Sequence, residues 1–560
     1  FKIPDKAGTF IGARIGRPEK AKPRELKGSP HVLFPVGEEG GRLRSVNAAL
    51  EKKQINADFP IYFCENCKRE TIYPVCEVCL KKTTKQYYCA KCKQVMHDHC
   101  PIHGKCKDFR KKSIDIEHYW QAACQLIQIN PEQVKLVKGV KGTSSASHIP
   151  ENLAKGLLRA LFDLHVNKDG TLRFDATELP ITHFKPAEIN CPVEKLIKLG
   201  YTHDIYGNKL ENPDQILALK PHDLILPKKA VSFFFKVANW IDAELVRIYK
   251  LKPFYQLKDE TDLIGHLVVF LAPHTCAGTV ARIIGFSQLQ AWLASPFLHA
   301  AVRRDCDGDE ASAMLLLDTF INFSQHYLPA HRGGTQDAPL VLNIKIKHEE
   351  VDDMIWDMES IDEFPLEFYK ACIEGLNPRE IATKLGIRQV VHAMIESRDK
   401  LNHALFEIKF TYGTQNINEG VTCSSYKLLN QMQDKVKAQL DLVNKIRACD
   451  VADMIRLLIE KHFLRDIRGN LRKFFRQQFR CSSCNKKFRR PPLSGKCDCG
   501  GNIIFTIAEG TIKKYVQAAL ELAETYSIAP YTKQVVDLTN KAINSIFPQS
   551  KQQNLLKWIK

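Results

Sequence analysis

The spacing of hydrophobic and polar positions changes along the chain and divides it into regions. Residues 1–60 combine short apolar runs with dense Gly, Pro and basic positions, which predicts strands and loops rather than long helices. Helical stretches alternate with loops over 111–250, and strand-like apolar runs follow around 263–273. We predict an apolar helix at about 311–328 and mainly helices over 365–480. The pattern therefore predicts an α+β multidomain chain.

Composition narrows the class of partner. The chain has 560 residues, enough for three or four domains, and its 44% apolar and 26% charged content is ordinary for a folded protein. Its net charge of +18 favours a polyanionic partner such as nucleic acid over a merely soluble basic protein. The sequence has no signal peptide and no apolar run long enough to span a membrane, so we expect no membrane partner. Because it begins at Phe1 rather than Met, we expect a piece of a longer protein.

The cysteines indicate metal sites rather than disulfides. Eight of the 19 cysteines lie in C-x2-C pairs beside Lys and Arg, a pattern typical of intracellular zinc sites. The first two pairs lie close together and can place four thiolates at the corners of a tetrahedron, as Zn²⁺ requires. These four residues are Cys64, Cys67, Cys76 and Cys79.

A second zinc set begins at Cys89 and Cys92. Its other ligands must come from the Cys and His positions that follow, which are His97, His99, Cys100, His103 and Cys106. The spacing favours Cys100 and His103, with Cys106 as the reserve candidate. A third set is Cys481, Cys484, Cys497 and Cys499. None of the sets implies an open coordination position, so we predict three structural zinc ions.

An acidic turn within 302–318 carries the candidate chemistry. Asp305, Asp307 and Asp309 alternate with other residues, so an extended backbone would point their carboxylates the same way, and Gly308 permits a tight bend. Such oxygen ligands suit Mg²⁺, and a pair of Mg²⁺ ions can activate a 3′-hydroxyl and stabilise a leaving pyrophosphate.

A calcium loop and a solvated turn are the two other interpretations of this acidic turn. A calcium loop places Gly at its sixth position, whereas Gly308 is fourth counted from Asp305, and this excludes an EF-hand. A better-placed Gly occurs in 165–176, but that segment ends in Ala176 instead of the bidentate acid and is predicted to be a turn into a strand. A solvated acidic turn is disfavoured because apolar residues flank 305–309 closely.

Basic residues recur near the second half of the chain. Five arginines at three- and four-residue steps predict one basic stripe on a helix, able to track phosphates without reading sequence. They are Arg465, Arg468, Arg472, Arg476 and Arg480. Arg303 and Arg304, directly before the acidic turn, are further predicted DNA contacts. The alternative is a solvated basic face.

The motif at 305–309 resembles the metal-binding loop of multisubunit RNA polymerases, which lies on a double-psi β-barrel. Several blocks are similar to the large subunit of archaeal family D DNA polymerase. They are GARIGRPEKAK (12–22), HVLFPVGEEGG (31–41), GTLRFDATELPITHFKP (170–186), LAPHTCAGTVARIIGF (271–286), RRDCDGDE (303–310), RGGTQDAPLVL (332–342), KIRACDVADMIR (445–456) and RDIRGNLRKF (465–474).

The resemblance implies two facing double-psi barrels with zinc modules and helical accessory regions. Its segments are 1–60 (first barrel, N-terminal part), 61–110 (double zinc module), 111–254 (remainder of the first barrel and connecting region), 255–350 (second barrel with the aspartates), 351–475 (helical DNA-binding region), 476–510 (C-terminal zinc module), 511–547 (helical tail) and 548–560 (clamp-binding motif). Lys20 and Lys22 match the basic residues that the opposite barrel offers, which would neutralise the triphosphate. Asp305 and Ala311 depart from the family pattern, where Asn and Asp are frequent.

The same resemblance implies function and partners. It implies template-directed DNA synthesis from dNTPs on primer-template DNA, in an archaeal cytoplasm and at its nucleoid. The partner would be a small subunit with 3′–5′ exonuclease activity, and an N-terminal half of the family's large subunit is expected to precede this chain. The tail resembles the motif that docks on the sliding clamp PCNA, through Gln552, Leu555, Trp558 and Ile559.

Two other functions remain open from the sequence. An RNA polymerase-like two-barrel synthase would share the barrels but leave the family D blocks unexplained. A non-catalytic zinc scaffold that binds DNA would explain the charge and the cysteines but not the aspartates.

Overall fold

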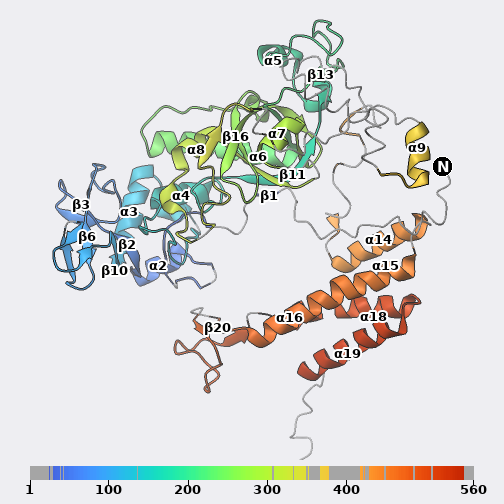
Figure 1. The fold of residues 1–560 in the computed structure, drawn as a ribbon. Helices are drawn as coiled ribbons and strands as arrows, with labels where there is room; N and C mark the ends of the chain where they lie inside the picture. Colours follow the sequence, from blue (N-terminus) through green and yellow to red (C-terminus); the bar gives the residue numbers. More distant parts are fainter. Residues whose placement is uncertain are drawn as a thin grey trace, which may run out of the picture. The chain divides into compact units, whose positions relative to one another are not determined.

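The structure, a computed structural model, divides into two compact units (Figure 1). One is Lys20–Ser424, and the other combines Phe1–Glu19 with Ser425–Lys560. No described helix is both long and apolar enough to cross a membrane. The described residues are 24–25, 30–37, 39–41, 43–96, 98–134, 136–304, 308–331, 333–347, 351, 366–377, 416–419, 422, 428–429, 431–446, 450–482, 486–505, 507 and 509–547.

The unit Lys20–Ser424 is built around a closed sheet of six strands. Their order is β11-β17-β14-β16-β15-β18, and β18 pairs back with β11, so the sheet has no free edge along this path. The pairs β11–β17 and β14–β16 are parallel and the other four are antiparallel. The strands are β11 (Phe174–Pro180), β14 (Asp223–Pro227), β15 (Leu267–Leu271), β16 (Ala277–Ser287), β17 (Ala291–Ala294) and β18 (Glu310–Leu315).

Aromatic side chains fill the centre of this barrel. The Trp292 ring of β17 lies 5.9 Å from Phe174 of β11 and 6.0 Å from Phe270 of β15, both edge-on. Phe234 of helix α6 (Lys228–Arg247) lies 6.4 Å from the same indole. The indole N–H donates to the backbone oxygen of Ala311, so this buried polar atom is satisfied. One core therefore joins α6 to three strands of the barrel.

The barrel draws strands from two of the predicted segments. β11 and β14 come from 111–254, whereas the other four strands come from 255–350. Two short strands also join it: β1 (Arg24–Glu25) pairs with β11, and β19 (Val341–Asn343) pairs with β16. The remaining sheets among the described residues have two or three strands.

The apolar helix predicted at 311–328 was wrong in its first part. Residues Glu310–Leu315 form β18, and helix α8 covers only Leu316–Asn322, before a short 3-10 turn at Gln325–Tyr327. The first part of the stretch is mostly apolar and short, so its period does not separate a buried strand from a buried helix. Pairing of β18 with both β11 and β15 decides the structure.

Helices surround the barrel and precede it in the chain. Ser45, Asp115 and Asn152 each accept a backbone N–H bond and begin α2, α3 and α4, as helix N-caps do. Helix α2 lies within 1–60, where only strands and loops were predicted. The helices of this unit are α2 (Val46–Lys52), α3 (Ile116–Ile127), α4 (Leu153–Leu161), α5 (Val193–Lys198), α6, α7 (Pro296–Ala301), α8 and α9 (Leu366–Glu374).

The first cysteine-rich module is an insertion between two long paired strands. β2 (Gln54–Pro60) and β10 (Phe109–Asp115) pair along their full length, and the module occupies the chain between them. The insertion lies between Pro60 at the end of β2 and Phe109 at the start of β10. Its short strands are β3 (Tyr62–Cys64), β4 (Arg69–Thr71), β5 (Thr84–Lys85), β6 (Tyr87–Cys89), β7 (Gln94–Met96), β8 (His99–Cys100) and β9 (Gly104–Lys105). Outside the module, β12 (His183–Phe184) pairs with β13 (Leu217–Ala218).

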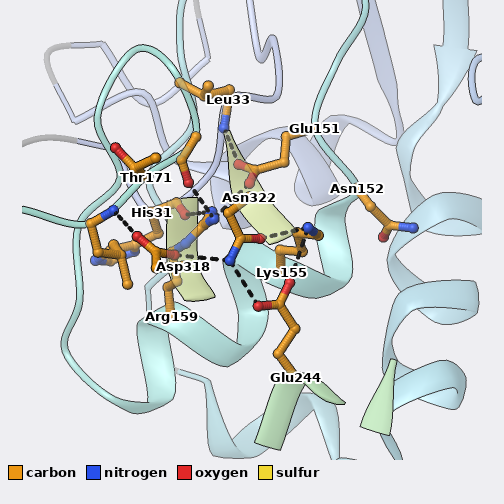
Figure 2. Close-up of polar contacts among 12 residues, drawn as sticks. His31, Leu33, Glu151, Asn152, Lys155, Arg159, Thr171, Glu244, Asp318 and Asn322 are labelled. Carbon is orange, nitrogen blue, oxygen red and sulfur yellow. Dashed lines mark hydrogen bonds and ion pairs between the residues drawn. The ribbon is translucent and has the colours of Figure 1, made fainter. Parts of the chain in front are cut away.

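A buried polar network links the helices beside the barrel (Figure 2). Arg159 of α4 is fully buried, and its guanidinium donates to Glu151 at 2.7 Å. It also donates to the backbone oxygens of His31 and Gly170, which lie in separate loops. Burying a charge without partners is costly, so these bonds fix the two loops against α4.

The network continues to α8, the helix that follows β18 (Figure 2). Lys155 donates to Asn322 at 2.6 Å and lies 3.0 Å from Glu244 of α6. Asn322 in turn donates to Glu244 and to Asp318, both at 2.9 Å. The Leu172 backbone N–H donates to Asp318 at 2.7 Å, just before β11 begins. Helices α4, α6 and α8 are thereby held to the start of β11.

The unit that contains Ser425–Lys560 is mainly helical. Its core includes Phe463 and Tyr515, whose rings stack with centroids 5.0 Å apart. A three-stranded sheet follows the long helix α16. The elements are α14 (Met432–Ile446), α15 (Val451–Leu457), a π-helix (Leu458–Phe463), α16 (Leu464–Arg476), β20 (Phe479–Cys481), β21 (Lys487–Phe488), β22 (Ile503–Phe505), α17 (Glu509–Lys513), α18 (Val516–Thr525) and α19 (Pro530–Ile546).

The arginine stripe is shorter than predicted. Arg465, Arg468, Arg472 and Arg476 lie on α16, but Arg480 lies in β20, so its placement on the helix was wrong. The helix ends at Gln477, whose backbone is extended, because the chain turns into the sheet that carries Cys481.

Candidate metal sites and basic groove

The first cysteine group assembles as four sulfurs around one point. The sulfurs of Cys64, Cys67, Cys76 and Cys79 all lie within 4.8 Å of one another, and those of Cys64 and Cys79 are 3.5 Å apart. The Lys81 backbone N–H is the largest of the influences that lower the pKa of the Cys79 thiol, to about 7. A thiolate is the form that binds metal, so amide groups aimed at sulfur suit a Zn²⁺ site.

The second group contains three cysteines and one histidine. The His103 Nδ1 atom lies 3.2 Å from the sulfur of Cys92 and 3.6 Å from those of Cys89 and Cys100. The backbone N–H of Cys92 is the main cause that lowers the pKa of the Cys89 thiol to about 6. This donor set, three sulfurs and one imidazole nitrogen, also fits a tetrahedral Zn²⁺ site.

The other candidates for the second set are placed differently. The buried Cys106 thiol bonds to the backbone oxygen of Gly104 and does not belong to the four-ligand group. His99 is exposed in β8, and His97 lies outside the described residues. Cys100 and His103 are thus the two that the fold brings to Cys89 and Cys92.

The third group is carried by the sheet that follows α16. Cys481, Cys497 and Cys499 come together, with 3.5 Å between the sulfurs of Cys481 and Cys499. Cys484, its predicted fourth member, lies outside the described residues. The three gathered sulfurs fit three of the four ligands of a structural zinc site.

The acidic loop connects α7 to β18. Asp309 is the described member of the three aspartates, and its side chain is 45% exposed. The Arg304 guanidinium donates to the Asp309 carboxylate and to the backbone oxygen of Pro273, both at 3.0 Å. Gly308 has a φ of 95°, a backbone conformation that glycine adopts without strain. An accessible carboxylate after a tight bend fits an oxygen ligand for Mg²⁺.

Hydrogen bonds of the backbone fix both ends of this loop. The Arg304 N–H donates to the His299 oxygen in α7 at 3.0 Å. The Glu178 N–H in β11 donates to the Asp309 oxygen at 2.9 Å. The loop therefore starts and ends on elements that belong to the barrel core.

Some predicted site residues lie outside the described part of the chain. They are Lys20, Lys22, Asp305, Asp307, Cys484, Gln552, Leu555, Trp558 and Ile559. Of the two arginines before the acidic turn, Arg303 is exposed, whereas Arg304 is mostly buried in its contact with Asp309.

A basic groove of about 720 Å³ lies along α15, the π-helix and α16. Lys461, Arg465, Gly469 and Lys473 line it at steps of four residues, which places them on one helix face. A Cβ atom at Gly469 would meet nothing within 4 Å, so the groove is open at its middle. The arrangement offers three cations beside an accessible stretch of backbone.

Comparison with known proteins identifies the family. A family model described as DNA polymerase II large subunit DP2, catalytic domain, matches residues 130–435, and the model of the DP2 central domain matches 1–98. The DNA polymerase II large subunit of Nanoarchaeum equitans is 45% identical over 99% of this chain and 48% of its own length. The corresponding proteins of Archaeoglobus fulgidus and Pyrococcus furiosus are 44% and 43% identical over 99% and 98% of this chain, and over 49% and 44% of their own lengths.

This chain belongs to the DNA polymerase II large subunit (DP2) family. The resemblance inferred from the sequence is confirmed. The chain spans about half the length of the curated DP2 relatives it matches.

The two DP2 models cover different candidate sites, and the third cysteine group and the basic groove lie outside both matches. The catalytic-domain match at 130–435 contains all six barrel strands and the acidic loop. The central-domain match at 1–98 contains the first cysteine group and ends within the second.

Two features of this DP2 chain escaped sequence reasoning. Lys461 and Lys473 share a groove with Arg465, and their four-residue spacing is a signal that could have found them. Glu178 and His299 flank the acidic loop, but they are distant in sequence and no local pattern connects them.

Proposed function

We propose that this chain carries the nucleotidyl-transfer centre of a template-directed DNA polymerase. The observation that carries the proposal is the position of the acidic loop, which leads into a strand of the closed barrel inside the region matched by the DP2 catalytic domain. The reaction would join a dNTP to the 3′-hydroxyl of a primer.

The closed six-stranded sheet is proposed to be a double-psi barrel. Its mixture of parallel and antiparallel pairs and its closure support that assignment. A second barrel that includes residues 1–60 would face it, and Lys20 and Lys22 would then neutralise the triphosphate of the incoming nucleotide.

Asp305, Asp307 and Asp309 would hold two Mg²⁺ ions. Bound Mg²⁺ activates an attacking hydroxyl and stabilises the charge of a leaving pyrophosphate. The chain's own contribution is to orient the ligands: the Arg304 guanidinium and the Glu178 backbone hold Asp309 at its side chain and at its backbone. The charge-assisted bond from Arg304 also holds the Asp309 carboxylate in one orientation.

The three sulfur-rich groups are proposed to hold structural zinc. The ligands come from short hairpins, and the second group forms a small cluster of its own that contains Cys89, Cys100 and Cys106. Metal binding would therefore supply much of the folding energy of these modules.

The basic groove and the arginines of α16 are proposed to contact the DNA backbone. Lys461, Arg465 and Lys473 would bind phosphates, and the exposed Arg468, Arg472 and Arg476 would extend the contact along the helix. Such contacts position a duplex without reading its sequence. Arg303, exposed before the acidic loop, would contact the primer or template.

Two protein partners are proposed. The relatives are named large subunits, which supports assembly with a small subunit, and we assign the 3′–5′ exonuclease to that subunit. The tail motif at Gln552, Leu555, Trp558 and Ile559 would dock on the sliding clamp through one apolar helical turn.

Primer extension on the assembled polymerase tests the proposed reaction. Extension with dNTPs in Mg²⁺, its loss in EDTA and no extension with NTPs support a DNA polymerase. Preference for NTPs would instead favour an RNA polymerase-like synthase. DNA binding without any extension would favour a non-catalytic zinc scaffold.

A further inference from the structure

A pair of buried side chains connects α7 and β11, the two elements that hold the ends of the acidic loop. The His299 Nδ1 atom of α7 is 3.0 Å from the Glu178 Oε2 atom of β11, and both side chains are fully buried. Among the described residues, neither carboxylate oxygen of Glu178 and neither ring nitrogen of His299 has a well-aligned hydrogen bond. The imidazole ring also contacts Phe270 of the barrel core, with centroids 5.8 Å apart.

The same two residues hold the ends of the loop through their backbones. His299 accepts the N–H of Arg304 where the loop begins, and Glu178 donates its N–H to Asp309 where the loop ends. The distance between the loop's two ends therefore depends on how far β11 lies from α7. The contact between the two side chains connects those two elements directly.

We propose that Glu178 and His299 form a buried clamp that positions Asp309 for metal binding. Both are positioning residues, because they act through the backbone of the loop and not on a substrate. The inference rests on the proposed function, since it concerns the ligands of the same Mg²⁺ site.

The cost of burying polar groups indicates what this pair contributes. Two buried polar groups cost free energy that an apolar pair of similar volume would not, so the pair adds little to stability. It does constrain geometry, because the two side chains can approach to 3.0 Å only when β11 and α7 lie at one separation. Residues that orient metal ligands from behind typically contribute 10- to 100-fold to metal affinity. We expect an effect of about that size here.

Three variants of the full zinc-loaded chain separate positioning from folding. Glu178→Leu leaves the imidazole without a partner and should lower both the melting temperature and the affinity for Mn²⁺, used as a probe for Mg²⁺. Glu178→Leu combined with His299→Leu removes both polar groups, so the melting temperature should recover. The Mn²⁺ affinity of the double variant should stay lowered about 10-fold or more. Glu178→Gln, which keeps the shape, should weaken Mn²⁺ binding in the same direction but less.

Asp223→Asn is the matched control. It disrupts another pair in the same barrel, because Asp223 is buried and accepts two bonds from Arg282 at 2.8 and 2.9 Å. It should lower the melting temperature without changing Mn²⁺ binding.

The measurement is a titration followed by the electron paramagnetic resonance of Mn²⁺, with Asp309→Ala defining the binding that belongs to the loop. The clamp would be overturned if the double variant binds Mn²⁺ as tightly as the unchanged chain. If the double variant does not fold, the same result for Glu178→Gln would overturn it. Absence of Asp309-dependent binding in the unchanged chain would overturn the metal site itself. The two failures are therefore distinguishable.

Discussion

Asp318 shows what burial does to a single carboxyl group. It is fully buried at the start of α8, and desolvation is the main cause that raises its pKa to about 7. Bonds from Leu172 and Asn322 oppose that shift only in part. Between pH 4 and 7 the unfolded chain has lost this proton while the folded chain keeps it. The contribution of Asp318 to the free energy of unfolding therefore falls as pH rises through this window, by roughly 1.4 kcal/mol per pH unit where the effect is fully expressed.

Asp318→Asn tests this dependence. The variant cannot ionise, so its stability should lose the part of the pH slope that Asp318 causes. Denaturant unfolding of the full chain at several pH values between 4 and 8 measures the difference between variant and unchanged chain. Identical slopes for the two proteins would show that Asp318 does not bind a proton on folding.

At the scale of residues, most predictions about the candidate sites came from residue types and their spacing. The C-x2-C pairs predicted the partners in the first two groups because chelation requires short loops. Alternating aspartates indicated metal chemistry at 305–309. The pair of Glu178 and His299 could not be predicted, because it arises only when β11 and α7 meet in the folded barrel.

At the scale of elements, the second cysteine module discriminates between two possible ligands. His103 faces three sulfurs, whereas Cys106 bonds to the backbone of Gly104. His103→Ala should make one zinc ion of the chain easy to remove with a competing chelator. Cys106→Ala should leave zinc retention unchanged. Zinc release rates, followed with a metal-sensitive dye, distinguish the two possible ligands. Easier release from the Cys106 variant alone would show that Cys106, and not His103, is the ligand.

The basic groove makes a second prediction about an element. Lys461→Ala combined with Lys473→Ala should weaken DNA binding for all sequences alike. It should also reduce the slope of log affinity against log salt by about 1 for each lost phosphate contact. Arg456→Ala is the control, since its guanidinium is held by Asp453 at 2.7 Å and Glu460 at 2.9 Å. Salt titrations that show equal slopes for all three proteins would exclude the groove as a phosphate site.

Sequence patterns predicted elements well only where neighbours along the chain decide the structure. The Asn167–Gly170 turn leads into β11 as its turn residues suggested, because a local hydrogen bond forms it. The stretch 311–328 was predicted as one helix, yet pairing with β11 and β15 makes its first part a strand. Arg480 was predicted on the helix, but it lies in β20, because the sheet around Cys481 begins there. In both failures a distant partner overrode the local pattern.

For the whole molecule, the chain combines a closed barrel with cysteine-rich hairpins and a basic helical unit. The sequence predicted that α+β combination, but not that β11 and β14 would join strands from the segment 255–350. Barrel closure depends on contacts between distant segments, and no local pattern records it. The acidic loop gains its fixed ends from this closure.

The central claim, that the acidic loop is the catalytic centre, is tested most directly by Asp309→Ala. The rate of single-nucleotide incorporation is measured for this variant in the assembled polymerase on primer-template DNA. We predict a rate lower by orders of magnitude with DNA affinity unchanged, because the substitution removes a metal ligand and no DNA contact. Incorporation at the rate of the unchanged enzyme would contradict the assignment of the acidic loop as the catalytic centre.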